Sequence, residues 1–286
     1  MLVMKFGGSS LATREHLLAA RDQVLESSGK DKTVVVVSAI GQTTDVLIGA
    51  DADPVAAAAA LLGIHEHALG AIADAPRESV ESALRSLPDR IGTWPEPEVH
   101  SLGERISSAI FHALLVESGC PAQDFGLHAV ALRAGAVPAV DQVATARRFL
   151  DLGFDPRRPE VTVVGGFGGI SPTGCLRLLG RGGSDTSATS IGAALGARVV
   201  ELWKDVDGIH ARDPREHSDS RLITHMRWSE ADALARTGAR ILHGPSIEPA
   251  WRARIPIHVR HTGHPEEPGT WIADVHSRAD DRRSVA

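Results

Sequence analysis

The sequence has few cysteines and no long apolar run. Only two cysteines occur among 286 residues, Cys120 and Cys175, and their separation matches no zinc or redox spacing. The longest apolar run, Val55 to Leu62, is far too short to cross a bilayer, and no leader-like N-terminus is present. We therefore expect a cytoplasmic protein that does not bind membranes.

An excess of basic residues is also missing. Lys and Arg total 30 against 36 Asp and Glu, which gives a formal net charge of −6. Binding to nucleic-acid phosphates needs a basic face, so nucleic acid is not expected as a partner. Hydrophobic residues make up 43% and charged residues 23%, which is typical of a globular protein with a substantial core.

The histidines form no recognisable metal-binding set. The nearest groupings are His65 with His67 and His258 with His261, and we interpret all four as surface residues. We predict no metal ion bound by the protein's own side chains.

Strand-like and helix-like patterns alternate along the chain. Leu2 to Phe6 and Thr33 to Val37 have the apolar character of strands covered on both faces, and Leu11 to Leu25 between them has helical spacing. Further strands are predicted at 161–164, 198–203 and 255–259, a hairpin return at 175–179, and a third strand–helix unit around 129–152. The alternation predicts an α/β fold, a three-layer αβα sandwich around a mainly parallel central sheet, with ligands at the carboxyl ends of the strands.

Two other regions have a distinct character. Helical patterns at 55–72 and 77–87, followed by a proline-containing segment at 88–97, predict a helical insertion or lid, and a further helix is expected from 101 to about 119. The last residues, about 273–286, are polar and charge-rich, so we expect this tail to fray.

Two glycine-rich turns carry the main chemical signal. The first is Lys5-Phe6-Gly7-Gly8-Ser9-Ser10, and the second is Gly180-Arg181-Gly182-Gly183-Ser184-Asp185-Thr186. Each follows an apolar run and precedes a helical pattern, so backbone N–H groups and a helix N-terminus can converge on a phosphate. The alternatives are a solvated lysine beside a tight turn for the first, and a helix cap with Ser184 as the capping residue for the second.

The position of Lys5 sharpens the phosphate interpretation. Neither turn matches a Walker A loop or a dinucleotide fingerprint. Lys5 instead precedes its glycines on the strand, so its ammonium can project over the loop toward a phosphoryl group in transfer.

Several motifs together resemble one known family. They are Lys-Phe-Gly-Gly-Ser-Ser at 5–10, Val-Ser-Ala at 37–39, Gly-Glu-Arg at 103–105, the turn at 180–186 and Trp-Lys-Asp-Val-Asp-Gly-Ile at 203–209. In order and approximate spacing they resemble the catalytic domain of aspartate kinases, in the amino acid kinase superfamily. The resemblance covers residues 1–272, and it implies an acceptor-binding lobe at about 1–160 and a nucleotide-binding lobe at about 161–272.

The resemblance implies a reaction and a set of ligands. The reaction is ATP-dependent phosphorylation of the side-chain carboxylate of L-aspartate, or a related small acid, to an acyl phosphate, with Mg²⁺ carried mainly by the nucleotide phosphates. A homodimer is expected from the same resemblance.

Residue roles follow from the matching positions. Lys5 and Asp185 are implied as catalytic, with Lys5 stabilising the phosphoryl group and Asp185 orienting Lys5. The nucleotide-binding positions are Lys5, Gly7, Gly8, Ser9, Lys204, Asp205, His210, Arg215 and Arg240. The substrate-binding positions are Ser38, Thr44, Glu104, Phe167, Arg181, Gly183 and Ser184, with Glu104 paired to the substrate ammonium and Arg181 to a carboxylate. The alternative for Glu104 is charge compensation at a helix start, and for Asp207 a turn-forming role.

Departures from the family pattern leave other functions open. Typical aspartate kinases continue into paired ACT regulatory domains, whereas this sequence stops soon after the kinase-like region. We expect either an unregulated enzyme or one that works with a separate regulatory subunit. Ile40-Gly41-Gln42 and Gly168 also differ from the common pattern. The alternatives are a kinase for another small acid, or a non-catalytic nucleotide-binding module on the same fold.

Overall fold

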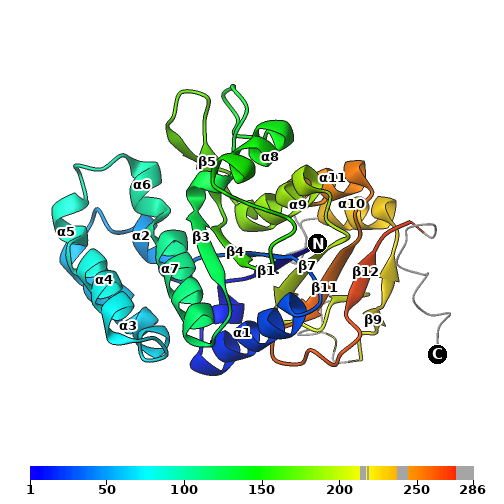
Figure 1. Ribbon diagram of the computed structural model, residues 1–286, viewed down its shortest axis with the longest axis horizontal. Helices are drawn as coiled ribbons and strands as arrows, with labels where there is room; N and C mark the ends of the chain where they lie inside the picture. The colour runs from blue at the N-terminus through cyan, green and yellow to red at the C-terminus, as the bar shows by residue number, and fades with distance from the viewer. Residues whose placement is uncertain (213–216, 218, 237–243, 275–286) are drawn as a thin grey trace.

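A single sheet of eight strands forms the middle of the molecule (Figure 1). The computed structural model describes residues 1–212, 217, 219–236 and 244–274. Across the sheet the order is β10 (His225–Met226), β12 (Thr270–Ile272), β11 (Ile257–His261), β7 (Val199–Lys204), β1 (Leu2–Phe6), β2 (Thr33–Val37), β4 (Val161–Gly165) and β3 (Ala122–Gly126). Only the β11–β12 pair in this sheet is antiparallel, so the prediction of a mainly parallel sheet is confirmed.

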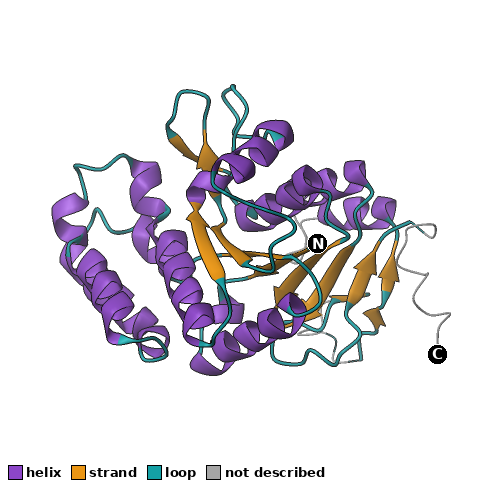
Figure 2. Cartoon of the chain, viewed as in Figure 1, coloured by secondary structure: helices purple, strands orange, loops and turns teal. Residues whose placement is uncertain are grey.

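Helices cover both faces of the sheet (Figure 2). The longer ones are α1 (Arg14–Ser28), α3 (Pro54–Leu69), α4 (Asp74–Arg85), α7 (Leu102–Glu117), α8 (Gln142–Asp151), α9 (Gly183–Leu195), α10 (Trp228–Arg236) and α11 (Gly244–Ala253). Shorter helical turns are η1 (Ser9–Leu11), α2 (Thr43–Ile48), α5 (Leu87–Arg90), α6 (Glu96–His100) and η2 (Leu127–Ala129). Two small hairpins, β5 (Gly168–Ile170) with β6 (Leu176–Leu178) and β8 (Ile209–His210) with β9 (Leu222–Ile223), complete the described elements.

The side chains of the central strand divide between two cores. Met4 and Phe6 belong to an apolar cluster shared with α1, α3, α4 and α7, whereas Val3 belongs to a second cluster shared with α8, α9, α10 and α11. Because successive side chains of a strand point to opposite faces, a strand buried on both faces is mostly apolar, as β1 is except at Lys5. The predicted three-layer αβα sandwich is therefore confirmed.

The predicted helical insertion lies at one end of the molecule, where α3 to α6 are seen in cyan in Figure 1. Its proline-containing part is helical too: Pro88 and Pro97 occupy the first turns of α5 and α6. Proline is tolerated there because its missing N–H has no helical partner in a first turn. A role for this region as a lid stays a prediction.

Two histidines predicted to be at the surface are buried, and that prediction is wrong for them. His65 is fully buried on α3, where its Nδ1–H donates to the carbonyl of Leu61 at 2.7 Å. His258 is 6% exposed on β11, where its Nε2–H donates to the carbonyl of Pro268 and its ring stacks on Trp271. Burial lowers the pKa of both rings, to about 4 for His258, so both are neutral at pH 7.

Ser184 does not cap α9, contrary to the prediction. The helix begins at Gly183, its N-cap is Gly182 with φ of 72°, and no side chain makes a capping hydrogen bond there. A left-handed N-cap turns the chain without a side-chain cap, which places Ser184 inside the first helical turn.

Three other expectations have different outcomes. The third strand–helix unit has its helix, α8, inside the predicted 129–152, but its strand is β3, which ends before that range begins. The lobe boundary near residue 160 stays a prediction, and β4, just beyond it, pairs with β2 and β3 from the N-terminal half. In the predicted tail, residues 275–286 lie outside the described residues.

Two helical glycines provide a test of the packing. A Cβ on Gly192, in α9, would lie 2.5 Å from Cγ2 of buried Val200 on β7, whereas a Cβ on Gly63, in α3, would meet nothing within 4 Å. We expect Gly192→Ala to lower the free energy of unfolding by about 1–3 kcal/mol through overpacking. Gly63→Ala should raise it by about 0.5–1 kcal/mol through helix propensity. Urea denaturation measures both, and equal changes of one sign would contradict this packing of α9 on β7.

Candidate active site

The predicted site loops meet along one edge of the sheet. β1, β2, β4 and β7 run parallel, so their carboxyl ends lie on the same side. Gly7, Ser38 and Gly166 directly follow β1, β2 and β4, and Lys204 is the last residue of β7. This edge is where open α/β sheets bind their ligands.

Asp185 lies at the centre of this edge, between two lysines. Its Oδ1 is 2.7 Å from Nζ of Lys5 at the end of β1, and its Oδ2 is 3.0 Å from Nζ of Lys204 at the end of β7. Asp185 is 4% exposed and occupies the first turn of α9. A carboxylate in a first helical turn is also favoured by the helix dipole. The predicted contact between Lys5 and Asp185 is present, and it is part of a three-residue charge cluster.

The cluster shifts the ionisation of its members. Burial alone would raise the pKa of Asp185, but the charges of Lys204 and Lys5 outweigh it and hold that pKa well below its usual range. Burial also lowers the pKa of Lys5, against the opposing attraction of Asp185. Two ammonium groups sharing one carboxylate leave a net positive charge at this edge, which suits an anionic ligand.

Glycines allow the loops around this cluster to pack closely. A Cβ on Gly8 would lie 2.6 Å from the carbonyl oxygen of Ala39, and the carbonyl of Gly8 accepts a hydrogen bond from Gly41 N at 3.0 Å. A Cβ on Gly166 would lie 2.7 Å from Cβ of Ser184. The loops after β1 and β4 therefore contact the loop after β2 and the start of α9 directly.

Glu104 is a buried carboxyl group with one oxygen that lacks a partner. It lies in the first turn of α7 and is 2% exposed. Its Oε1 accepts a hydrogen bond from Ala39 N at 3.1 Å, while no hydrogen-bond partner is described for its buried Oε2. Burial raises the pKa of Glu104 to about 8, although the Ala39 N–H opposes this shift. A buried acceptor of this kind is suited to a donor supplied by a ligand.

Phe167 has a strained backbone beside this edge. Its φ is 73°, and Gly168 N donates to the carbonyl of Gly166 at 2.9 Å across it, which describes a γ-turn of the rare positive-φ kind. Its ring lies over the start of α9, where a Cβ on Gly183 would come within 3.1 Å of Cδ2 of Phe167. Strained residues of this kind concentrate at ligand sites.

The other predicted site residues differ in exposure. Ser184 is buried, Ser38 and Thr44 are half-buried, and Ser9, Arg181 and Asp205 are exposed. His210 is half-buried, and its Nδ1–H donates to the carbonyl of Ser220 within the β8–β9 connection. Arg215 and Arg240 lie outside the described residues. The ligand contacts assigned to all these residues stay predictions.

The ion pair of Lys204 with Asp185 was not predicted, because the resemblance placed Lys204 only among the nucleotide contacts. The pairing of β7 beside β1, with Phe6 opposite Trp203, brings the two lysines together. No local pattern reveals which strands are neighbours in a parallel sheet. The available signal was that two buried-strand patterns each carry a lysine near the carboxyl end, Lys5 in Leu2–Phe6 and Lys204 in Val199–Lys204.

The chain belongs to the amino acid kinase family, whose model matches residues 1–261. Within that family it is similar to aspartokinases. It is 31% identical to aspartokinase 1 of Arabidopsis thaliana, over 94% of this chain and 51% of that protein, and 32% identical to the aspartokinase of Thermus thermophilus, over 96% of this chain and 60% of that protein. The chain thus spans between half and two thirds of the length of these relatives.

Solved structures show the same similarity. Escherichia coli aspartokinase III, solved with aspartate and ADP, has a TM-score of 0.86 and 29% identity, covering 96% of this chain and 64% of that chain. Isopentenyl phosphate kinase of T. acidophilum, at 19% identity and a TM-score of 0.54, covers 95% of this chain and 99% of that one and shares the fold alone.

Two features are absent from the described part of the chain. No three His, Cys, Asp or Glu side chains there gather into a group that could hold a metal ion. No helix among them has the length and apolar character to span a bilayer.

Replacing Lys5 tests the charge cluster. If Lys5 has the predicted catalytic role, Lys5→Met, which keeps the length of the side chain without its charge, should reduce phosphoryl transfer at least ~100-fold, because the charge predicted to face the transition state is lost. Lys204 still pairs with Asp185 in this variant, so its circular dichroism spectrum should match that of the wild type. Lys30→Met removes an exposed lysine paired only to Glu26 and serves as the control, with unchanged turnover. Equal turnover of the two variants would refute the role of Lys5.

Proposed function

We propose that the chain catalyses ATP-dependent phosphorylation of the side-chain carboxylate of L-aspartate, which gives 4-phospho-L-aspartate and ADP. The observation that carries the proposal is the Lys5–Asp185–Lys204 cluster at the carboxyl edge of the sheet. The similarity to a structure solved with aspartate and ADP, over 96% of this chain, supports both substrates. The homodimer expected from the family resemblance and the cytoplasmic location expected from the sequence belong to the same proposal.

The electrostatics of the cluster suit this reaction. A carboxylate is already ionised at neutral pH, so the acceptor needs no strong general base. The main obstacle is repulsion between the acceptor carboxylate and the γ-phosphate of ATP, two anions that must come within bonding distance. One carboxylate oxygen attacks the γ-phosphorus and the bond to the bridging oxygen of ADP breaks. Lys5, buried and held by Asp185, stabilises the negative charge on the transferring group.

The first glycine turn and the β7 edge form the nucleotide side of the proposal. Gly8 directly precedes η1 and Ser9 begins it, while Lys204 ends the neighbouring strand β7 and Asp205 follows it. Both oxygens of Asp185 lie beside lysine ammonium groups, which compete with a metal ion for this carboxylate. The donor set fits Mg²⁺ that enters on the ATP phosphates and keeps several of its waters. When bound, that ion neutralises phosphate charge.

Glu104 and Arg181 form the acceptor side. The unpartnered Oε2 of Glu104 accepts a hydrogen bond from the substrate ammonium, which satisfies a buried oxygen. Arg181, exposed beside the N-terminus of α9, pairs with a substrate carboxylate. The strained Phe167 lies between Glu104 and Arg181 in the sequence, and its ring packs on Gly183. An amino acid is thus recognised by two opposite charges, Glu104 for its ammonium group and Arg181 for a carboxylate.

A panel of acids tests the substrate. Purified chain, ATP and Mg²⁺ should form ADP with L-aspartate, and hydroxylamine should trap the acyl phosphate as a hydroxamate. L-glutamate, N-acetyl-L-glutamate and succinate are the comparisons, and each should react at least ~10-fold more slowly, because the pocket contacts differ. Turnover confined to another acid would overturn the substrate assignment. ATP binding without turnover of any acid would favour a non-catalytic module.

The ionisation of Glu104 predicts how aspartate binding depends on pH. Its pKa in the free protein is raised to about 8, so at pH 6–7 the carboxyl group is mostly protonated and must lose its proton to pair with an ammonium. KM for aspartate should therefore fall as pH rises from 6 to 8, by up to about tenfold per unit, and level off above pH 8.

Glu104→Gln is the matched variant for this measurement. The amide keeps an acceptor for Ala39 N but does not titrate. We expect a higher KM for aspartate in this variant, and one that varies little between pH 6 and 8. The same slope in both proteins would show that another group controls the pH dependence.

A further inference from the structure

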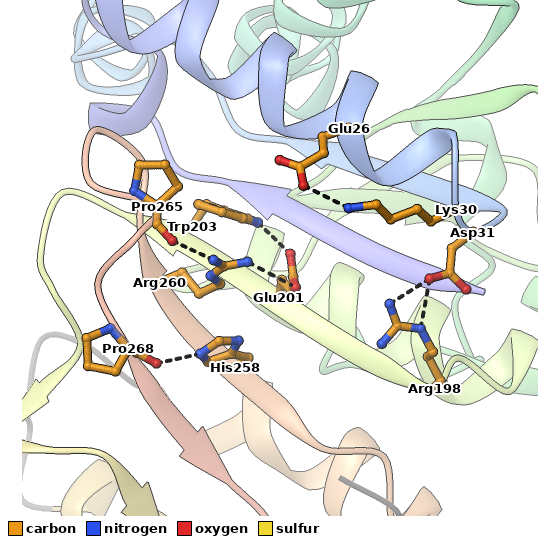
Figure 3. Close-up of polar contacts among 10 residues, drawn as sticks. All are labelled: Glu26, Lys30, Asp31, Arg198, Glu201, Trp203, His258, Arg260, Pro265 and Pro268. Carbon is orange, nitrogen blue, oxygen red and sulfur yellow. Dashed lines mark hydrogen bonds and ion pairs between the residues drawn. The ribbon is translucent and has the colours of Figure 1, made fainter. Parts of the chain in front are cut away.

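A cluster of polar and aromatic side chains lies on one face of β7 and β11 (Figure 3). In the parallel register of these strands, Glu201 is opposite His258 and Trp203 is opposite Arg260. All four side chains point to the same face because they occupy alternate positions. Arg260 and His258 both contact the loop that follows β11.

Arg260 makes three contacts at once. Its guanidinium carbon lies 4.3 Å from the centre of the Trp203 ring, its Nη1 lies 3.5 Å from Oε1 of Glu201, and its Nη2 donates to the carbonyl of Pro265 at 2.7 Å. The indole N–H of Trp203 donates to the other oxygen of Glu201 at 3.0 Å. A planar guanidinium can stack on a ring and direct its N–H groups to two acceptors, a combination that an ammonium cannot reproduce.

The carbonyl of Pro265 belongs to the loop at 262–269, which joins β11 to β12. This loop is also held by His258, which donates to the carbonyl of Pro268 at 2.9 Å. At its start, Thr262 N donates to the carbonyl of Lys204 at 2.9 Å. The loop held by Arg260 is therefore bonded directly to the main chain of the lysine that pairs with Asp185.

Trp203 connects the same cluster to the first glycine turn. Its carbonyl accepts hydrogen bonds from Gly7 N at 3.3 Å and from Oγ of Ser10 at 3.0 Å. Its ring is fully buried between Arg260 and Phe6, whose ring centre lies 5.9 Å away. The stack fixes β7 at the point where it contacts the loop after β1.

We propose that Arg260 is a positioning residue for the nucleotide side of the site, acting through the loop at 262–269 and through Trp203 on Lys204 and the Gly7–Ser10 turn. It touches no reacting atom. The proposal rests on the proposed function only in naming ATP as the nucleotide. The acceptor residue Glu104 hydrogen-bonds to Ala39, on the other side of β1, and shares no described contact with Arg260.

The test compares two Arg→Lys variants, one in β11 and one directly before the neighbouring strand β7. Arg260→Lys keeps the charge but loses the simultaneous stacking and forked hydrogen bonding. Arg198→Lys is the control: Arg198 immediately precedes β7 and pairs with Asp31 at the opposite end of the strands (Figure 3). Measurements are KM for ATP, KM for aspartate, and ADP affinity by isothermal titration calorimetry without acceptor.

We expect Arg260→Lys to raise KM for ATP and Kd for ADP by about tenfold, the equivalent of roughly one lost charged hydrogen bond, with KM for aspartate changed less than about twofold. Arg198→Lys should change none of them. Unchanged ADP affinity in folded Arg260→Lys, or equal increases in both KM values, would overturn the proposal. If Arg260→Lys does not fold, Glu201→Gln takes its place, because it loses the charge that Arg260 contacts. Glu201→Gln should also weaken ATP and ADP binding without changing KM for aspartate. Unchanged ADP affinity in this variant would overturn the proposal. ADP binding is measured without any acid, so a failed aspartate assignment leaves this test intact.

Discussion

One carboxylate shared by two lysines is the interaction on which the site depends. Asp185 joins the end of β1, the end of β7 and the start of α9 through contacts of 2.7 and 3.0 Å. Each lysine is expensive to bury alone, and a single carboxylate at a helix N-terminus stabilises both. These three elements come from distant parts of the chain. The charges of Lys5, Lys204 and Asp185 therefore hold β1, β7 and α9 in position, and the same charges suit a phosphoryl group.

Close packing of the loops follows from this constraint. The two lysines can reach one carboxylate only if the strand ends and the start of α9 approach closely, and Gly166 meets that need where it contacts Ser184. Gly8 does the same against Ala39, whose N–H holds Glu104. The strained γ-turn at Phe167 fits the same pattern, because a chain that reverses over the helix start has little room for relaxed geometry. Acceptor and nucleotide sides are thus linked through backbone contacts.

The sequence allowed the layers to be predicted from local patterns, whereas the Lys5–Asp185 contact was implied only by the family resemblance of several motifs. Buried-strand patterns such as Thr33–Val37 and the motifs around Lys5 and Asp185 are contiguous in the chain. What was missed depends on strand order. The Lys204–Asp185 pair, the stacking of Arg260 on Trp203 and the burial of His258 all arise where β7 lies between β1 and β11. The error at Ser184 has another cause: Gly182 takes a left-handed conformation and moves the start of the helix.

The two carboxyl groups of the site differ in whether the protein supplies an opposite charge to them. Both oxygens of Asp185 lie within ion-pair distance of lysines, and these charges keep the carboxylate ionised without a ligand, although its Oδ1 makes no well-directed hydrogen bond among the described residues. Glu104 has one buried oxygen without a described partner and a pKa raised to about 8. Glu104 Oε2 gains a hydrogen bond only when a ligand supplies a donor. The lysines around Asp185 are already in position and need no rearrangement to stabilise a bound anion. On the proposed function, the phosphoryl side is therefore built before binding and the acceptor side is completed by its ligand, so recognition of the acceptor is expected to be the step most sensitive to pH.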